Sequence, residues 1–356
     1  MLKKILKIVS ILLVALLVAV GGYVAYVFIS YSRLPDHLAL ETENNPDEML
    51  SIGTYSVISY NIGFGAYEDD YDFFMDGGTR SWAISKDRLT ENLSNIAELL
   101  RTEAADFYFL QEVDENGTRT YHVNERKLFT DCFSEYGCVW SEDWNSPFLF
   151  YPLTEPHGKN LAGMMTFSRY RMSEAERRSL PIENSVKKLV DLDRCYSITR
   201  VPVGDKELVL YNVHLSAYTT DGSIADEQVR MLVEDMEADY RAGNYVVCGG
   251  DFNKDMLGNS AELFGVDGQA QTWAQPFPTK YLEGTGLRLA VPFDETNPVP
   301  SCRNADAPYH DEQFVLTVDG FIVSENVQVE ELAVIDTGFA YSDHNPIRLT
   351  FSLREN

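Results

Sequence analysis

The stretch YVVCGGDFNKD, residues 245–255, changes abruptly from apolar residues to glycine, aspartate and asparagine. Its first four residues are apolar, which predicts a short buried strand that ends at the two glycines. Glycine, aspartate and asparagine are also the residues that most readily form turns. Taken alone, the stretch therefore predicts a simple turn more strongly than a polar site at the end of a strand.

Other apolar runs of the chain also lead to side chains that can carry chemistry. Six segments place an Asp, Glu, Asn or His at or beside a strand end: Asn61 in residues 55–63, Glu112 in 105–113, His214 in 207–218, Asp251 and Asn253 in the opening stretch, Asp319 in 314–324, and Asp343 with His344 in 342–353. Each of these residues alone has an ordinary explanation, such as a turn or a buried, hydrogen-bonded histidine. Their repetition at six strand ends favours a common site.

Two segments with helical spacing of apolar residues, 85–100 and 225–242, alternate with these strands. Alternation of this kind predicts an α/β fold. Because strand ends in such sheets tend to meet in one crevice, we expect the polar side chains to converge there. Residues 64–84, 117–160 and 254–312 show no clear pattern. The last two are too long for idle loops, so we expect them to form the rim of a site.

The N-terminus contains 22 residues without a charge, Ile8 to Ile29, preceded by Lys3, Lys4 and Lys7. About 20 apolar residues are enough to cross a bilayer, and basic flanks stay in the cytoplasm. A cleaved secretory signal is the alternative, but its apolar region is usually only about 7–15 residues long. The sequence therefore predicts an uncleaved signal anchor over residues 1–33. We expect a single-pass protein of the cell membrane, with residues 34–356 outside the cytoplasm.

Residues 34–50 are acidic, contain two prolines and lack periodicity, which predicts a linker before a domain that spans residues 51–356. The net charge of the chain is −26, and subtracting the four cations of residues 1–33 leaves −30 on the exported part. Such a surface repels nucleic-acid phosphates at long range, which disfavours a polynucleotide partner. Nothing in the sequence indicates a protein partner.

Five cysteines form no metal-binding pattern. Cys132 and Cys138 lie close enough in sequence to close a small disulfide loop outside the cell.

The order of six motifs resembles the endonuclease/exonuclease/phosphatase superfamily of metal-dependent phosphoesterases, which includes deoxyribonucleases, sphingomyelinases and inositol-polyphosphate phosphatases. The motifs are YNIG, LQEV, NVHL, GGDFN, TVDGFIV and YSDHNPI, and they extend from about residue 55 to 353. The resemblance implies a four-layer α/β sandwich, in which two packed mixed β-sheets are flanked by helices and the site lies between the sheet ends. It also implies that the two glycines of GGDFN let the backbone approach a phosphate.

The resemblance implies roles for individual residues. Mg²⁺, or Mn²⁺ in its place, would be held by Glu112, Asn61 and Asp343; carboxylates and water are the usual ligands of Mg²⁺. His344 would be the base-type histidine, oriented by Asp319, and His214 would donate to a phosphoryl oxygen or to the leaving group. Asp251 and Asn253 would align the attacking water. Either Asp251 or His344 would take its proton, and the motifs do not decide between them.

One segment departs from the resembled lipid-phosphodiesterase branch, which usually carries an Asn-Gly-Gly-like run before the strand of MMTFSRY. Here the run reads Asn160-Leu161-Ala162-Gly163, so an additional phosphate contact from Asn160 is the weakest of the expected contacts. We expect a membrane-tethered, Mg²⁺-dependent phosphodiesterase acting on lipid headgroups or other small substrates. The alternatives are an exported nuclease and a catalytically inactive binding protein on the same fold.

Overall fold

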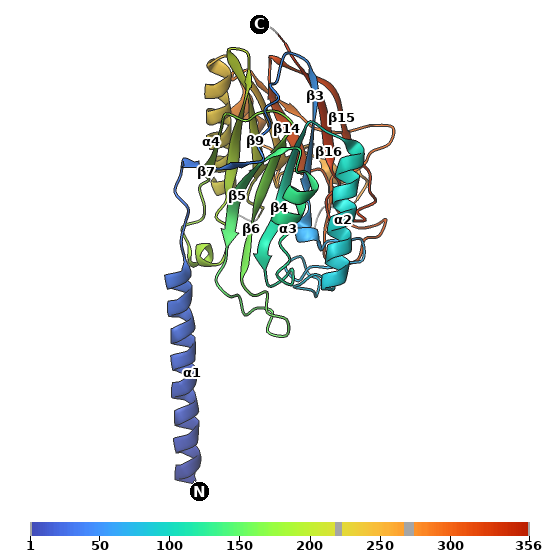
Figure 1. Cartoon of the computed structure of the whole chain (residues 1–356). Coiled ribbons are helices and arrows are strands. Elements are labelled where there is room, and N and C mark those ends of the chain that lie inside the picture. The colour runs from blue at the N-terminus through green and yellow to red at the C-terminus, as the bar shows by residue number, and fades with distance from the viewer. Residues whose placement is uncertain (1, 218–222, 267–273, 355–356) are drawn as a thin grey trace.

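Two seven-stranded β-sheets pack face to face in the computed structural model, which describes residues 2–217, 223–266 and 274–354 (Figure 1). The first sheet contains, in spatial order, β1 (Leu38–Ala39), β7 (Glu174–Ser179), β8 (Cys195–Val203), β9 (Lys206–His214), β10 (Tyr245–Asp251), β14 (Asp319–Ser324) and β11 (Leu287–Ala290). The second sheet contains β15 (Val327–Val334), β16 (Ile347–Leu353), β3 (Thr54–Asn61), β4 (Phe107–Gly117), β6 (Asn160–Ser168), β5 (Gly137–Asn145) and β2 (Thr42–Glu43). A small separate sheet pairs β12 (Cys302–Arg303) with β13 (Val315–Leu316).

Helices cover the outer faces of both sheets, which completes the four layers and confirms the predicted fold (Figure 1). The helices α2 (Lys86–Glu103) and α3 (Glu125–Cys132) pack on the second sheet, and α4 (Ser223–Arg241) packs on the first. Short helical turns occur at α5 (Ser260–Leu263), η1 (Gly63–Gly65), η2 (Val186–Leu189) and η3 (Thr279–Leu282). Apolar side chains at helical spacing, such as Leu89 and Leu93 of α2, are fully buried, so hydrophobic burial holds these layers together.

Parallel pairs at the centre of each sheet bring the strand ends to one edge. β3 runs parallel to β4, and β9 runs parallel to β10. Asp251 at the end of β10 lies opposite His214 of β9 on one side and Asp319 of β14 on the other. Strand register alone therefore places three of the predicted site residues next to one another.

The two glycines of the GGDFN motif are required by packing between the sheets. A Cβ atom on Gly249 would lie 2.5 Å from the ring of Phe321, which fills the core there. A Cβ on Gly250, whose φ is 147°, would lie 2.1 Å from the carbonyl oxygen of Val213. The glycines thus allow β10 to approach its neighbours closely, a role that the sequence interpretation did not include.

Three segments differ from the sequence expectations. Residues expected to form a loose linker contribute β1 and β2, which add a short edge strand to each sheet. The unassigned stretch 117–160 contains α3 and β5, and β4 continues past Glu112 to Gly117. Cys132 and Cys138 are not joined; the five cysteines are all free thiols.

The N-terminal helix α1 (Leu2–Ser30) projects away from the sheets (Figure 1). It is long and apolar enough to cross a membrane, with a mean hydropathy of 2.7 over its most apolar window, none of which is buried in the protein.

Candidate active site

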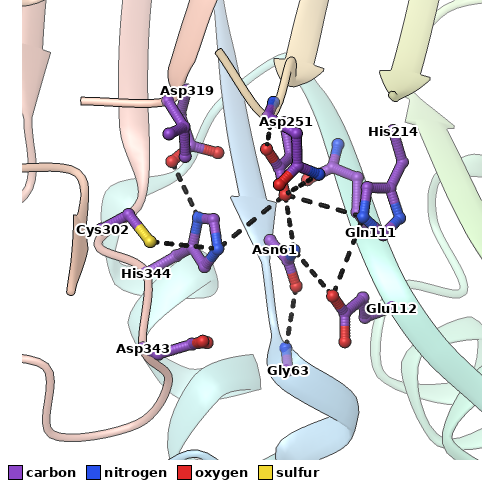
Figure 2. Close-up of polar contacts among 12 residues, drawn as sticks. Asn61, Gly63, Gln111, Glu112, His214, Asp251, Cys302, Asp319, Asp343 and His344 are labelled. Carbon is purple, nitrogen blue, oxygen red and sulfur yellow. Dashed lines mark hydrogen bonds and ion pairs between the residues drawn. The ribbon is translucent and has the colours of Figure 1, made fainter. Parts of the chain in front are cut away.

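Asn61 lies at the centre of the converging strand ends and connects the two sheets (Figure 2). Its Nδ2 atom donates to Glu112 Oε1 at 3.1 Å and to Asp251 Oδ2 at 3.0 Å. Its Oδ1 atom accepts the backbone N–H of Gly63 at 3.0 Å, which fixes the orientation of the amide. Asn61 belongs to the second sheet and Asp251 to the first, so this one side chain sets the distance between their functional groups.

Glu112 faces the site because β4 is irregular at this point. Its φ is +54°, a left-handed conformation that costs a non-glycine residue about 1 kcal/mol or more. The pairing of β4 with β6 shifts register between Leu110 and Val113, as in a β-bulge. The neighbouring Gln111 points into the core instead, where its Nε2 donates to Asn212 at 2.7 Å. The bulge thus turns a carboxylate, 28% exposed, toward the open edge.

The loop after β10 orients Asp251 tightly. Asn253, with a φ of +49°, donates its backbone N–H to Asp251 Oδ1 at 2.8 Å. The Asn253 side-chain amide donates to the carbonyl of Leu215 at 2.9 Å, which ties the ends of β9 and β10 together. Asp251 is 2% exposed and accepts hydrogen bonds on both of its oxygens. These hydrogen bonds fix the orientation of the carboxylate.

His344 and Asp319 form a buried pair. His344 Nδ1 lies 2.8 Å from Asp319 Oδ2, which also accepts the hydroxyl of Ser301 at 2.7 Å. His344 Nε2 lies 3.8 Å from Asp251 Oδ2 and 3.6 Å from the sulfur of Cys302. Burial disfavours the charged imidazole, but the facing Cys302 and Asp319 outweigh it and hold the pKa of His344 well above its ordinary value.

His214 lies on the opposite side of Asp251. Its Nε2 atom is 3.6 Å from Asp251 Oδ2 and 3.8 Å from Glu112 Oε1. Its Nδ1 atom faces Oδ2 of Asp143 at 3.6 Å, and neither of these two buried atoms has a hydrogen-bond partner. Asp143 lies where the pairing of β5 with β6 shifts register, in a stretch to which the sequence analysis assigned no strand, so no pattern pointed to it.

Asp343 points toward the site and lies on the opposite side of Asn61 from Glu112 (Figure 2). Burial raises the pKa of Asp343 to about 7, and the charge of Glu112 adds to this effect. Two carboxylates that disfavour each other's charge suit a divalent cation, which takes one or two carboxylates together with water and substrate oxygens. Within the described residues no group of three or more His, Cys, Asp or Glu side chains forms a compact metal cluster. Glu112 and Asp343, beside Asn61, are the donors that the sequence analysis predicted for a cation.

Asn160 lies apart from this arrangement at the start of β6. Its Nδ2 donates to the carbonyl of His157 at 3.3 Å, and its backbone N–H donates to Ser146 at 3.0 Å. Asn160 is fully buried and ties the β5–β6 loop to the sheet. The other predicted residues are brought together at one sheet edge.

Residues 58–344, which include these strand ends, match the model of a known family, described as the Endonuclease/Exonuclease/phosphatase family. The chain belongs to this family. Members of the family are hydrolases that act on phosphate esters and generally use divalent metal ions. No curated protein sequence matches the chain.

Solved structures of the family share the fold. One is the endonuclease/exonuclease/phosphatase from Beutenbergia cavernae DSM 12333, with a TM-score of 0.58, 17% identity, and coverage of 85% of this chain and 72% of that one. Another is ANGEL2, a 2',3'-cyclic phosphatase in complex with adenosine-2',3'-vanadate, with a TM-score of 0.57, 16% identity, and coverage of 89% and 99%. The human Nocturnin catalytic domain with bound sulfate has a TM-score of 0.53, 16% identity, and coverage of 88% and 97%.

Proposed function

We propose that the protein is a membrane-tethered, Mg²⁺-dependent phosphoesterase that cleaves phosphodiesters of lipid headgroups or other small substrates. The observation that carries the proposal is the arrangement around Asn61. Carboxylates suited to a cation, Glu112 and Asp343, lie on two sides of it, and Asp251 lies between two histidines. Hydrolysis of a phosphate ester requires these two kinds of group, one for the charge of the phosphate and one for proton transfer.

Glu112, Asp343 and Asn61 would hold a divalent cation, which would supply positive charge to the non-bridging oxygens of the phosphate. His214 donates from Nε2 to a phosphoryl oxygen or to the leaving group, since this atom faces the open site and Nδ1 faces Asp143.

Asp251, held by Asn61 and Asn253, and His344, held by Asp319, align the attacking water. Oδ2 of Asp251 and Nε2 of His344 are 3.8 Å apart, a distance that one water molecule would bridge, and Asp251 or a neutral His344 would take its proton.

The identity of the substrate does not follow from the fold. Proteins of similar fold act on different esters: ANGEL2 is a 2',3'-cyclic phosphatase, and the structure of D. rerio TDP2 holds a single-strand DNA product. The net charge of −26 argues against a polynucleotide, because non-specific binding to the phosphate backbone depends on basic contacts. A lipid headgroup or a small soluble ester meets no such requirement.

The position of the site relative to α1 supports a substrate at the membrane. The strands β3 and β4 run toward the same end of the domain from which α1 projects, and their polar ends lie there (Figure 1). With Lys3, Lys4 and Lys7 in the cytoplasm, α1 crosses the membrane once and the site faces the outer surface of the bilayer.

Phosphorus NMR of the full chain in detergent tests the function. The protein is incubated with Mg²⁺ and a mixture of phospholipids, inositol phosphates and short DNA. His344→Ala serves as the blank, and His310→Ala, in an exposed loop, is the matched control. We expect one new phosphate resonance, from a lipid or small ester, with the wild type and His310→Ala only. A signal from DNA would identify a nuclease, and no signal from folded protein would favour an inactive binding protein.

A further inference from the structure

The loop between β5 and β6 exposes large apolar side chains at its tip. Phe150 is 51% exposed, Tyr151 is 70% exposed and Leu153 is 83% exposed. Single exposed apolar residues are normal on a soluble surface, but three within four positions on one projecting loop form a patch. The loop is the part of the domain that extends furthest alongside α1 (Figure 1).

Two tyrosines of α1 hold this loop. Tyr23 donates its hydroxyl to the carbonyl of Phe148 at 2.9 Å, and the backbone N–H of Phe148 donates to the hydroxyl of Tyr26 at 3.0 Å. The ring of Tyr23 also packs edge-on against Phe150, with centroids 5.0 Å apart. Both backbone polar groups of Phe148 therefore have hydrogen-bond partners within the protein. A chain segment that enters a bilayer needs such partners, because no water is available there.

The contact also shows how far along α1 the loop lies. Tyr23 lies seven residues before Ser30, the end of α1, which corresponds to about 10 Å along a helix. The apolar run of α1 continues to Ile29, so the loop meets α1 beside the last turns of its apolar segment. A loop at this level cannot stay in water if α1 crosses the membrane.

Two lysines lie near the same end of α1, in a segment that also carries Glu183 and Asp191. The short turn η2 carries Lys187 and Lys188 beside Val186, which is 76% exposed. Lys188 Nζ lies 5.9 Å from the ring of Tyr31, directly after α1. Arg33 is also present, although Asp193 at 2.6 Å partly neutralises it. Lysines at this level attract anionic headgroups.

We propose that residues 148–153 and η2 form an interfacial surface that sits in the headgroup layer of the bilayer crossed by α1. The loop tip inserts its apolar side chains, and Lys187 and Lys188 contact anionic headgroups. The domain is thereby held with its active-site edge toward the bilayer, rather than moving freely on a linker. This inference rests on the membrane span of the proposed function but not on the phosphoesterase activity.

Depth measurements with a fluorescent label test the proposal on the full chain in phosphatidylcholine–phosphatidylglycerol vesicles. An environment-sensitive dye is attached in a Cys132→Ser background, because Cys132 is the one described cysteine that is not buried. Leu153→Cys reports on the loop. The matched control is Ile52→Cys, at the opposite end of the domain. The side chain of Ile52 is 43% exposed, and its neighbour Gly53 accepts a hydrogen bond from the backbone N–H of Leu353.

We expect a blue-shifted emission at position 153 and quenching by brominated acyl chains at least threefold stronger than at position 52. Equal, water-like signals at both positions in protein that resists alkaline extraction would overturn the insertion of the loop. Protein that alkaline extraction removes would overturn the membrane span and the proposal with it. Neither outcome depends on catalytic activity, so a failure here is distinct from a failure of the phosphoesterase function.

The role of the lysines has its own test. Lys187→Glu with Lys188→Glu should reduce quenching at position 153 in vesicles that contain phosphatidylglycerol and leave it unchanged in pure phosphatidylcholine. If quenching at position 153 is equal for the double variant and the parent in both kinds of vesicle, Lys187 and Lys188 are not part of the proposed surface.

Discussion

Asn61 is the residue through which the two sheets share one site, because its amide contacts Glu112 of one sheet and Asp251 of the other. Most of the residues predicted from the sequence were named because they lie at or beside the end of a predicted strand. Asp143 was missed, since its significance comes only from the unpaired Nδ1 of His214 that it faces. Side chains at strand ends can be predicted from one sequence, whereas partners supplied by a bulge in a distant strand cannot.

Glu112→Gln should abolish the rise in melting temperature that Mg²⁺ causes in the wild type, because a neutral amide is a much weaker ligand for a hard cation. Glu115→Gln on the same strand is the matched control, since Glu115 pairs with Arg126 at 3.1 Å instead of facing the site. Thermal unfolding with and without Mg²⁺ provides the comparison. A full Mg²⁺ response in Glu112→Gln would remove Glu112 from the cation site.

Asp143→Asn should lower kcat about 10-fold with little change in KM, because the carboxylate that faces Nδ1 no longer fixes the orientation of the His214 imidazole. Steady-state rates on a soluble phosphodiester test this expectation, and an unchanged melting temperature distinguishes it from loss of folding. An unchanged kcat would show that the facing carboxylate has no part in catalysis.

At the scale of elements, β3, β4, β9, β10, α2 and α4 were predicted because their apolar periodicity is regular. β5 was not predicted because it carries Trp140, Glu142 and Asp143 and shifts register, which breaks the alternation expected of a strand. The edge strands β1 and β2 have two residues each, too few for any periodicity. Elements too irregular or too short to show a regular period were therefore the ones that the sequence did not reveal.

Gly250→Ala should destabilise the protein by about 3 kcal/mol or more, because the new methyl group would meet the carbonyl of Val213 between β10 and β9. Gly204→Ala should cost only about 1–2 kcal/mol, since that glycine also has a positive φ but no atom within 4 Å of the added Cβ. Urea unfolding of the full chain in detergent measures both. Equal losses would contradict the close approach of the two strands.

Replacing Phe150 and Leu153 together by aspartate should leave hydrolysis of a soluble ester within about twofold of the wild type, since both side chains are exposed and outside the site. The same double variant should raise the apparent KM for substrate in vesicles about 10-fold or more, because charged residues are costly at the membrane interface. Parallel assays on soluble and vesicle substrates separate the two effects. An unchanged apparent KM on vesicles would argue against a membrane role for the loop.

For the whole molecule, the buried His157 connects stability to pH. Burial, helped by the charge of Arg119, lowers the pKa of His157 to about 3, compared with about 6.5 in an unfolded chain. The unfolded state therefore binds more protons between these values. The contribution of His157 is fully present above pH 6.5 and is lost as the pH falls toward 3.

Below pH 6 the free energy of unfolding should consequently decrease by up to about 1.4 kcal/mol per pH unit through this residue. His157→Gln cannot be protonated and should show a flatter dependence between pH 6 and 4. Urea unfolding at several pH values measures both proteins. Parallel curves for the two would show that His157 is not held in its neutral form.

The central claim is that the edge shared by the two sheets binds a divalent cation and hydrolyses phosphate esters with it. The most direct measurement is the hydrolysis rate of a soluble phosphodiester by the full chain in detergent, before metal removal, after chelation, and after Mg²⁺ is restored. We predict that the wild type and Glu115→Gln lose activity on chelation and regain it with Mg²⁺, while Glu112→Gln stays at least about 100-fold slower throughout. Activity that survives chelation, or that Glu112→Gln retains in full, would contradict the account.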